Sequence, residues 1–218
     1  MQGLLSIEMA EQVYYVDEND QPTGDVREKL AAHGLDTKLH AAFSCYIFND
    51  KGQFLVTQRA HSKKVWPSVW TNSVCGHPAP AENREDAVRR RAKYELGMEL
   101  QDLQLVVPDY RYKTPPYNGI IENEYCPVFV AIVKTESQLN PDEVEDYKWV
   151  DWQWYVNNLS NDPKDYSVFA EKAPKELDET MPHWSWWCKD QLQYLQQSKS
   201  FEDFISNKQQ KGVVRSEK

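Results

Sequence analysis

The chain has 218 residues, of which 40% are hydrophobic and 27% are charged, and its formal net charge is -9. This length exceeds that of disulfide-stapled mini-proteins, and the apolar fraction suffices for an ordinary globular core. The negative charge argues against a general nucleic-acid binder, because neutralising phosphates requires a basic surface. We expect a globular protein with a small-molecule ligand and without a nucleic-acid, membrane or obligate protein partner.

The four cysteines include no CxxC pair and no tight spacing, which predicts thiols in a reducing compartment. No basic residue precedes Arg27, and no apolar stretch approaches the roughly 20 residues of a membrane span. We therefore expect a cytoplasmic protein without signal peptide or transmembrane helix. Its predicted organisation is a flexible extension over residues 1–10, one domain over residues 11–200, and a C-terminal helix end with a polar tail over residues 201–218.

The first half of the chain begins with strand patterns. QVYYV, residues 12–16, predicts a short strand that ends at the turn-rich DENDQPTG. AAFSCYIF, which begins at Ala41, is followed by the turn NDKG and by QFLVTQR. Two apolar runs around a short turn predict a β-hairpin.

Residues 82–97 have the pattern of a helix, with acidic residues near Asn83 as the N-cap, apolar residues along one side and Gly97 at the end. Strand patterns follow at LQLVV, at PDYRYK, along the whole of GIIENEYCPVFVAIV and at YKWVDW, which precedes a helix. Residues 183–209 have helical character. Strands with one central helix and terminal helices predict an α/β or α+β sandwich around a mixed sheet.

The stretch WTNSVCGHP, residues 70–78, places Cys75 and His77 around a glycine and before a proline. These residues keep the backbone irregular and leave side chains accessible. A thiol there can act as a nucleophile, as an acid or base, or as a ligand. The alternative is an inert cysteine buried in a turn, which a single cysteine taken alone favours.

Glu122 and Glu124 alternate along a predicted strand and therefore share one face. Neighbouring carboxylates repel each other unless a divalent cation or a shared proton lies between them. A solvated strand face is an equal alternative. His33, His40 and His77 add nitrogen ligands of the kind that Zn2+ or Mn2+ accepts, but their spacing gives no helical ligand pair, and surface or core histidines remain the alternative.

The segment GHPAPAENREDAVRRRAKYELGM, residues 76–98, resembles the Nudix box, G-x5-E-x7-R-E-U-x-E-E-x-G-U with U apolar. The matching residues are Gly76, Glu82, Arg90, Ala92, Glu95, Gly97 and Met98. Arg91 and Tyr94 stand where the box has glutamates. In Nudix hydrolases these glutamates hold the metals that activate water, so their loss predicts retained diphosphate binding without hydrolysis.

Five motifs, one of them part of this altered box, closely resemble the type 1 isopentenyl-diphosphate isomerase family, from about Tyr15 to the region of Trp187. The motifs are AAHGLDTKLH, QRAHSKKVWPSVWTNSVCGHP, RRRAKYELG, PDYRY and ENEYCPVF. The resemblance implies a Nudix-like fold in which helices enclose a mixed sheet. It also implies a metal-dependent 1,3-allylic proton shift that interconverts isopentenyl and dimethylallyl diphosphate in isoprenoid biosynthesis.

The resemblance also implies roles for individual residues. Cys75 and Glu124 correspond to acid/base groups on opposite faces of the substrate, with Tyr112 as a helper. Trp187 corresponds to the ring that faces the carbocation, and Trp184 and Trp186 are the alternatives. A tightly bound ion, Mn2+ or Zn2+ or else Mg2+, is implied for His33, His40, His77, Glu122 and Glu124. Glu95 corresponds to the ligand of a Mg2+ shared with the diphosphate, and the residues implied to bind the diphosphate are Lys29, Arg59, Lys63 and Arg91.

The implied chemistry explains these residue types. Protonating an unactivated alkene creates a tertiary carbocation, so the site must exclude water and supply an acid, a base and a ring without a reactive lone pair. Two rival interpretations remain at this point. A Nudix hydrolase would release phosphate, and a catalytically inactive diphosphate- or metal-binding module would show no turnover.

Overall fold

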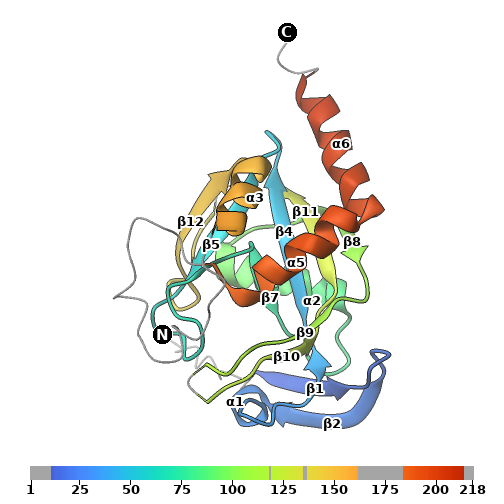
Figure 1. Ribbon diagram of the computed structural model, residues 1–218, viewed down its shortest axis with the longest axis vertical. Helices are drawn as coiled ribbons and strands as arrows, with labels where there is room; N and C mark the ends of the chain where they lie inside the picture. Colours follow the sequence, from blue (N-terminus) through green and yellow to red (C-terminus); the bar gives the residue numbers. More distant parts are fainter. Residues whose placement is uncertain (1–10, 118, 135–136, 162–183, 214–218) are drawn as a thin grey trace, which may run out of the picture.

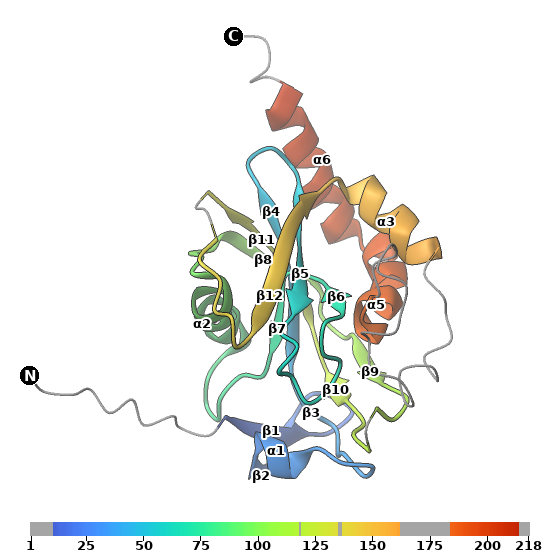
Figure 2. The ribbon, with the colours of Figure 1, turned by 90° about the vertical axis from the view of Figure 1, so that its left-hand side faces the viewer.

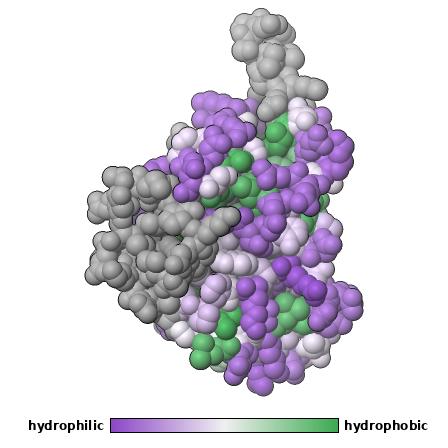
Figure 3. Space-filling view, viewed as in Figure 1, coloured by the Kyte–Doolittle hydropathy of each residue, from purple (hydrophilic) through white to green (hydrophobic). Residues whose placement is uncertain are grey.

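The computed structural model describes residues 11–117, 119–134, 137–161 and 184–213, with side chains as far as residue 207. The extension expected over residues 1–10 and the last five residues of the expected tail lie outside this part. None of the described helices is long and apolar enough to cross a membrane. Hydrophilic side chains predominate on the described part of the face in Figure 3, in keeping with the charged composition.

The larger of two sheets is mixed. Its strands are β4 (Phe43–Asn49), β5 (Phe54–Arg59), β6 (Trp70–Thr71), β7 (Val74–Gly76), β8 (Gln101–Val107), β11 (Val128–Val133) and β12 (Val144–Val150). They follow the order β12-β5-β4-β11-β8, with β6 beside β5 and β7 beside β4. β11 pairs with β4 in parallel, and the other pairs are antiparallel.

The smaller sheet lies at one end of the larger one. Its strands are β1 (Gln12–Val16), β2 (Pro22–Glu28), β3 (His40–Ala41), β9 (Arg111–Lys113) and β10 (Asn123–Tyr125). The order is β2-β1-β3-β10-β9, with the short helix α1 (Lys29–Ala32) beside it. Figures 1 and 2 show β1, β2 and α1 together below the main body.

Helices cover both faces of the larger sheet. α2 (Arg84–Leu96) lies on one face, and α3 (Trp152–Asn161), α5 (Trp186–Gln197) and α6 (Lys199–Val213) lie on the other, as Figure 2 shows. This arrangement confirms the expected sandwich around a mixed sheet. Along β4, Tyr46 and Phe48 pack toward α5 and α6, whereas Cys45 and Ile47 pack toward α2. A strand covered on both faces is apolar at most positions, because successive side chains point to opposite sides.

The predicted hairpin of β4 and β5 is confirmed, but its two strands separate soon after the turn. The only register pair that joins them among the described residues is Phe48 with Phe54. Farther along, β7 pairs with β4 and β6 pairs with β5, so residues 70–76 lie between the two strands. We call the gap between the separated strands the fork. Ser73 bridges it, because its hydroxyl accepts from Ile47 N at 2.8 Å and donates to Leu55 O at 2.6 Å.

The predicted central helix is confirmed with a slightly later start. Asn83 is the N-cap and accepts from Asp86 N, and Gly97 ends the helix in the left-handed region at φ 66°. The apolar side of the helix is buried against the sheet, as predicted.

Three strand and helix assignments differ from the sequence expectation. The run of residues 119–133 is not one strand but β10 and β11 in different sheets, since Pro127 has no backbone N–H to continue a ladder. Part of the turn-rich DENDQPTG belongs to β2. The C-terminal helical region is divided at Ser198, whose side chain bonds to Val106 O.

Candidate active site

The predicted ligand residues meet between the two sheets. His33 ends α1, His40 lies on β3, and His77 follows β7. Glu124 reaches the group because β10 pairs with β3, with Glu124 opposite His40. The three histidines have ligand atoms within 4.8 Å of one another, and so does the group of His40, Glu122 and Glu124. The structure therefore brings all five residues together, and at 7% exposure Glu124 is not on a solvated strand face.

Backbone carbonyls fix the orientation of two imidazoles. His33 Nδ1 donates to Lys29 O at 2.5 Å, and His40 Nδ1 donates to Lys38 O at 2.9 Å. Their Nε2 atoms then face carboxylates, 3.2 Å from Glu122 Oε2 and 3.8 Å from Glu124 Oε1. With neutral rings these are lone pairs that face lone pairs, and such an arrangement requires a proton or a cation between them.

The protonation states of two of the histidines favour a cation. Burial lowers the pKa of the third, His33, but its hydrogen bond to Glu122 and the charge of Glu122 outweigh burial and raise that pKa. Burial, reinforced by the charge of His77, lowers the pKa of His40 to about 4. Burial, reinforced by Lys29, lowers the pKa of His77 to about 3. Two buried atoms, His40 Nε2 and His77 Nδ1, have no hydrogen-bond partner. Neutral imidazole is the form that binds a metal, so this donor set fits a divalent ion.

The two carboxylates differ in their surroundings. Burial opposes ionisation of Glu122, but the hydrogen bond to His33 and the charge of His33, whose own pKa is raised by this pair, outweigh burial and lower the pKa of Glu122 to about 2. Burial and then the charge of Glu122 raise the pKa of Glu124. Tyr112 lies opposite Glu124 on β9, and its hydroxyl donates to Glu124 Oε2 at 2.8 Å. Glu124 is thus held on one side by a phenol and on the other by His77 Nε2 at 3.1 Å.

Cys75 lies on β7 opposite Ser44 of β4. Its Sγ donates to Asn72 Oδ1 at 3.2 Å and lies 3.3 Å from Ser44 Oγ. Burial raises the pKa of the thiol to about 12, so Cys75 is a thiol at neutral pH. Its residue is half-buried, whereas Cys45 and Cys126 are fully buried.

The three candidate tryptophans occupy different surroundings. Trp184 pairs with Trp70 and packs on Tyr155 in the core, with ring centroids 5.1 Å apart. Trp186 stacks on Tyr112 with centroids 5.7 Å apart. Trp187 donates its indole N–H to Asn72 Oδ1 at 3.2 Å, the same oxygen that accepts from Cys75. Of the three, Trp187 is the one bonded to the residue that contacts the thiol.

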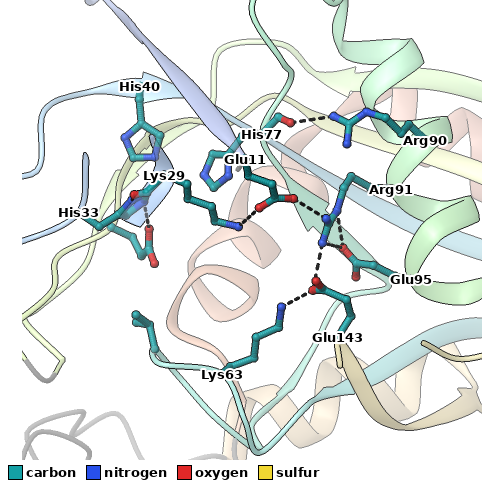
Figure 4. A network of polar contacts seen from close by, with 12 residues as sticks. Glu11, Lys29, His33, His40, Lys63, His77, Arg90, Arg91, Glu95 and Glu143 are labelled. Atoms are coloured by element: carbon teal, nitrogen blue, oxygen red, sulfur yellow. Dashed lines mark hydrogen bonds and ion pairs between the residues drawn. The ribbon is translucent and has the colours of Figure 1, made fainter. Parts of the chain in front are cut away.

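Three of the four predicted diphosphate-binding cations form one network (Figure 4). Arg91 donates to Glu11 at 2.5 Å, to Glu95 at 2.5 and 2.8 Å and to Glu143 at 3.0 Å. Lys29 pairs with Glu11 at 2.5 Å, and Lys63 pairs with Glu143. Burial opposes the charge of Arg91, but these carboxylates outweigh it and raise its pKa. Its close packing across β7 requires Gly76, where a Cβ would lie 3.1 Å from Arg91 Cγ.

Arg59 has different partners from the other three cations. Its guanidinium donates to the carbonyls of Val65 and Trp66, both at 3.0 Å. It also lies 5.5 Å from the ring centroid of Trp187. Arg59 therefore joins the predicted diphosphate side to the predicted aromatic ring.

The sequence interpretation missed Glu11 and Glu143 as partners of these cations. No local pattern could have indicated them, because Arg91 is 80 and 52 positions away along the chain. It also gave no role to Asn72, although WTNS was part of a quoted motif. The available signal was an asparagine three residues before Cys75.

Comparisons with known proteins show which families this chain is similar to. Residues 38–172 match the model of the NUDIX domain family. Isopentenyl-diphosphate Delta-isomerase of Klebsiella pneumoniae (strain 342) is 53% identical over 168 residues, which cover 77% of this chain and 91% of that protein. The protein of the same name from Salmonella typhi is 50% identical over 173 residues, covering 77% and 95%.

A solved structure supports the fold independently. The crystal structure of DR0079 from Deinococcus radiodurans superposes with a TM-score of 0.53 at 20% identity, covering 76% of this chain and 94% of that chain. An identity this low supports the fold alone. The two sequence relatives are 53% and 50% identical to this chain, and the matches cover 91% and 95% of their own lengths. The chain therefore carries a NUDIX domain and belongs to the isopentenyl-diphosphate Delta-isomerase family.

Proposed function

We propose that this protein interconverts isopentenyl and dimethylallyl diphosphate, a step of isoprenoid biosynthesis, by moving a proton between two carbons of the substrate. The observation that carries the proposal is the pair of proton carriers, the buried Glu124 and the half-buried Cys75, whose pKa values are both raised by loss of solvent. The charge of Glu124 acts on the thiol, which supports a shared site. A proton source and a proton acceptor are the minimum that an allylic shift needs.

Glu124 and Cys75 are the acid/base groups in this mechanism, one on each face of the substrate. One group donates a proton to the alkene, and the other removes a proton from the neighbouring carbon. Tyr112 holds the carboxyl of Glu124 through its 2.8 Å hydrogen bond. Burial and the charge of Glu124 raise the pKa of Tyr112 well above its ordinary value, so its hydroxyl remains a donor throughout.

We assign the tight ion to His33, His40, His77, Glu122 and Glu124, and Mn2+ or Zn2+ fits three nitrogen and two carboxylate ligands. When bound, the ion supplies positive charge that tunes the proton affinity of Glu124. The protein's own contribution is to orient the ligands. The carbonyls of Lys29 and Lys38 hold the rings of His33 and His40, which keeps their Nε2 atoms directed at the carboxylates.

The diphosphate side consists of Lys29, Arg59, Lys63 and Arg91, with Glu95 as the ligand of a Mg2+ ion that accompanies the substrate. Both bonds from Arg91 end on Glu95 Oε1, so Oε2 is the oxygen with which Glu95 would hold this ion. Contacts to the unreacting diphosphate supply binding energy that orients the alkene between the proton carriers.

Trp187 is the ring that faces the developing cation. An aromatic face attracts positive charge without offering a lone pair for bond formation. Trp187 is 4% exposed and its N–H is held by Asn72, which supports a fixed ring in a dry site. Water must be excluded because it would trap the carbocation as an alcohol.

Hydrolysis of the diphosphate has less support. Arg91 stands where the Nudix box has a glutamate, and it neutralises Glu95 one turn away. Tyr94 stands at a second such position and its side chain is exposed. A helix that lacks these carboxylates has few ligands with which to activate a water molecule.

Incubation with isopentenyl diphosphate and Mg2+ in D2O tests the proposal. Dimethylallyl diphosphate should form with deuterium at the exchanged carbons, as followed by proton NMR. Release of inorganic phosphate or pyrophosphate at a comparable rate would instead identify a hydrolase. If neither product forms, the protein would be a binding protein without turnover.

A further inference from the structure

Asn72 occupies the fork between the separated strands of the hairpin, and it is fully buried. Its Nδ2 donates to two backbone carbonyls, Cys45 O at 3.2 Å and Val74 O at 3.3 Å. These two bonds determine which end of the amide is the nitrogen. Oδ1 must therefore point the other way, toward the candidate active site.

Three donors surround this oxygen. They are Cys75 Sγ and Trp187 Nε1, both at 3.2 Å, and Thr71 Oγ1 at 3.0 Å. A carbonyl oxygen has two lone pairs, so three donors are one too many. Thr71 has an alternative partner in Ser185 Oγ at 2.8 Å. The two lone pairs of Asn72 Oδ1 thus match the thiol and the indole.

The other side of the thiol is also defined. Ser44 Oγ accepts from Gln191 Nε2 at 2.8 Å, which leaves the hydroxyl hydrogen of Ser44 to point at Cys75 Sγ, 3.3 Å away, or at Cys126 Sγ, 3.4 Å away. Cys75 can then accept from Ser44 while it donates to Asn72. With the Ser44 hydrogen directed at Cys75, the S–H group donates to Asn72.

We propose that Asn72 is a positioning residue that couples the Cys75 thiol to the Trp187 ring through a single buried oxygen. The inference rests on the roles of Cys75 and Trp187 in the proposed function. The thiol is on β7 and the ring is on α5, 115 positions from Asn72 along the chain. One shared acceptor holds a proton carrier and a cation-stabilising ring at a constant separation, and small misplacements of reacting groups are costly.

Asn72→Leu tests the coupling, because leucine is close in size but neither donates nor accepts hydrogen bonds. We expect kcat to fall at least about tenfold, while KM for isopentenyl diphosphate changes less than about threefold. Thr71→Val is the matched control, since it removes the third donor at the same oxygen and leaves the thiol and indole bonds. Its kcat should stay within about twofold of wild type. Equal losses in the two variants would overturn the proposal, because general loosening of the fork would explain both.

The indole N–H gives a readout that does not depend on turnover. In 15N-labelled protein its NMR peak is assigned by its absence in Trp187→Phe. We expect a downfield, slowly exchanging peak in wild type that moves upfield in Asn72→Leu, while the other indole peaks stay in place. A wild-type peak at the position of an unbonded indole overturns the proposal even if Asn72→Leu does not fold. If wild type fails to isomerise the substrate, the proposed function is wrong, and this peak still decides whether Asn72 holds the ring.

Discussion

The two charged regions of the candidate active site reach electrostatic balance in different ways. The histidine cluster, defined as His33, His40 and His77 with Glu122 and Glu124, directs lone pairs at one another and leaves His40 Nε2 and His77 Nδ1 without hydrogen-bond partners. The cation network, defined as Lys29, Lys63 and Arg91 with Glu11, Glu95 and Glu143, pairs each cation with a carboxylate.

Under the proposed function, this difference would separate a site for a resident ion from a site for a diphosphate that binds and leaves in each turnover. In the histidine cluster, two carboxylates face imidazoles of which two have lowered pKa values, so a bound cation would complete it. A group of buried cations without anions would be costly between turnovers, because unpaired buried charge is strongly unfavourable. Internal carboxylates remove this cost, and an incoming diphosphate must then compete with them. Five predictions test the contrast, beginning with the largest expected effect.

Loss of one ligand from the histidine cluster should remove the resident ion. We expect purified His40→Ala to lose its tightly bound metal and, with it, nearly all turnover, since His40 is fully buried at the centre of the cluster. Metal analysis by mass spectrometry measures this directly. His61→Ala is the control, because His61 is exposed and should keep the ion. Equal metal content in wild type and His40→Ala would show that the cluster is not a metal site.

Removing the thiol should stop proton transfer and leave the cation network intact. Cys75→Ala should lower kcat by about a thousandfold or more, whereas affinity for a diphosphate analogue should change little. Steady-state kinetics and calorimetry measure the two effects. Cys45→Ala serves as the control, because Cys45 packs against α2 on the other face of the sheet. A Cys75→Ala variant with near-normal kcat would remove Cys75 from the mechanism.

The ring of Trp187 should matter for a cation more than for a neutral ligand. A cation–π contact in a dry site contributes roughly 2 kcal/mol, so Trp187→Leu should slow turnover by tens-fold or more and Trp187→Phe only modestly. An ammonium analogue of the carbocation should lose affinity in the leucine variant, while an uncharged diphosphate analogue should not. Equal losses would mean that Trp187 only packs the site. A full effect at Trp184 or Trp186 would identify a different ring.

Removing a carboxylate that competes with the diphosphate for the cations should strengthen substrate binding. Glu11 neutralises Lys29 and Arg91 and is more exposed than the other two carboxylates. We expect Glu11→Gln to lower KM by about threefold with little change in kcat, because the diphosphate no longer displaces a charged partner. Glu18→Gln, at an exposed position near Arg111, should leave KM unchanged. A higher KM in Glu11→Gln would mean that Glu11 orients the cations rather than competing for them.

The smallest effect concerns stability and pH. Burial opposes ionisation of Glu143, but Arg91 and Lys63 outweigh it and lower its pKa below the ordinary value of 4.5. A lowered folded pKa means that the pairing stabilises the protein fully above about pH 4.5 and is lost as the pH falls through the folded value. Glu143→Gln should therefore cost about 1–2 kcal/mol of unfolding free energy at pH 7 and progressively less below pH 4.5.

Denaturant unfolding at several pH values measures this difference. Glu99→Gln is the control, because its ion pair with Lys93 is exposed and should contribute little at any pH. A cost for Glu143→Gln that stays constant down to pH 3 would exclude the charge of Glu143 as its cause.

Local patterns in the sequence determined the elements whose partners are near in the chain. The helix from Arg84 to Leu96 was readable from its cap, its apolar side and Gly97, because these signals lie within one segment. The hairpin turn was readable for the same reason. The placement of Cys75 with Glu124 came from a family resemblance, since nothing in the spacing of residues 75 and 124 indicates contact.

Tertiary structure decided everything that depends on distant partners. It divided residues 119–133 between two sheets, separated β4 from β5, and placed Asn72 in the resulting fork. It also brought Glu11 and Glu143 to Arg91. Periodicity reports which face of an element is buried, but it carries no information about which residue lies across the gap. For that reason the ligand types of this site were visible in the sequence, whereas the carboxylates that balance its cations and the amide that joins its thiol to its ring were not.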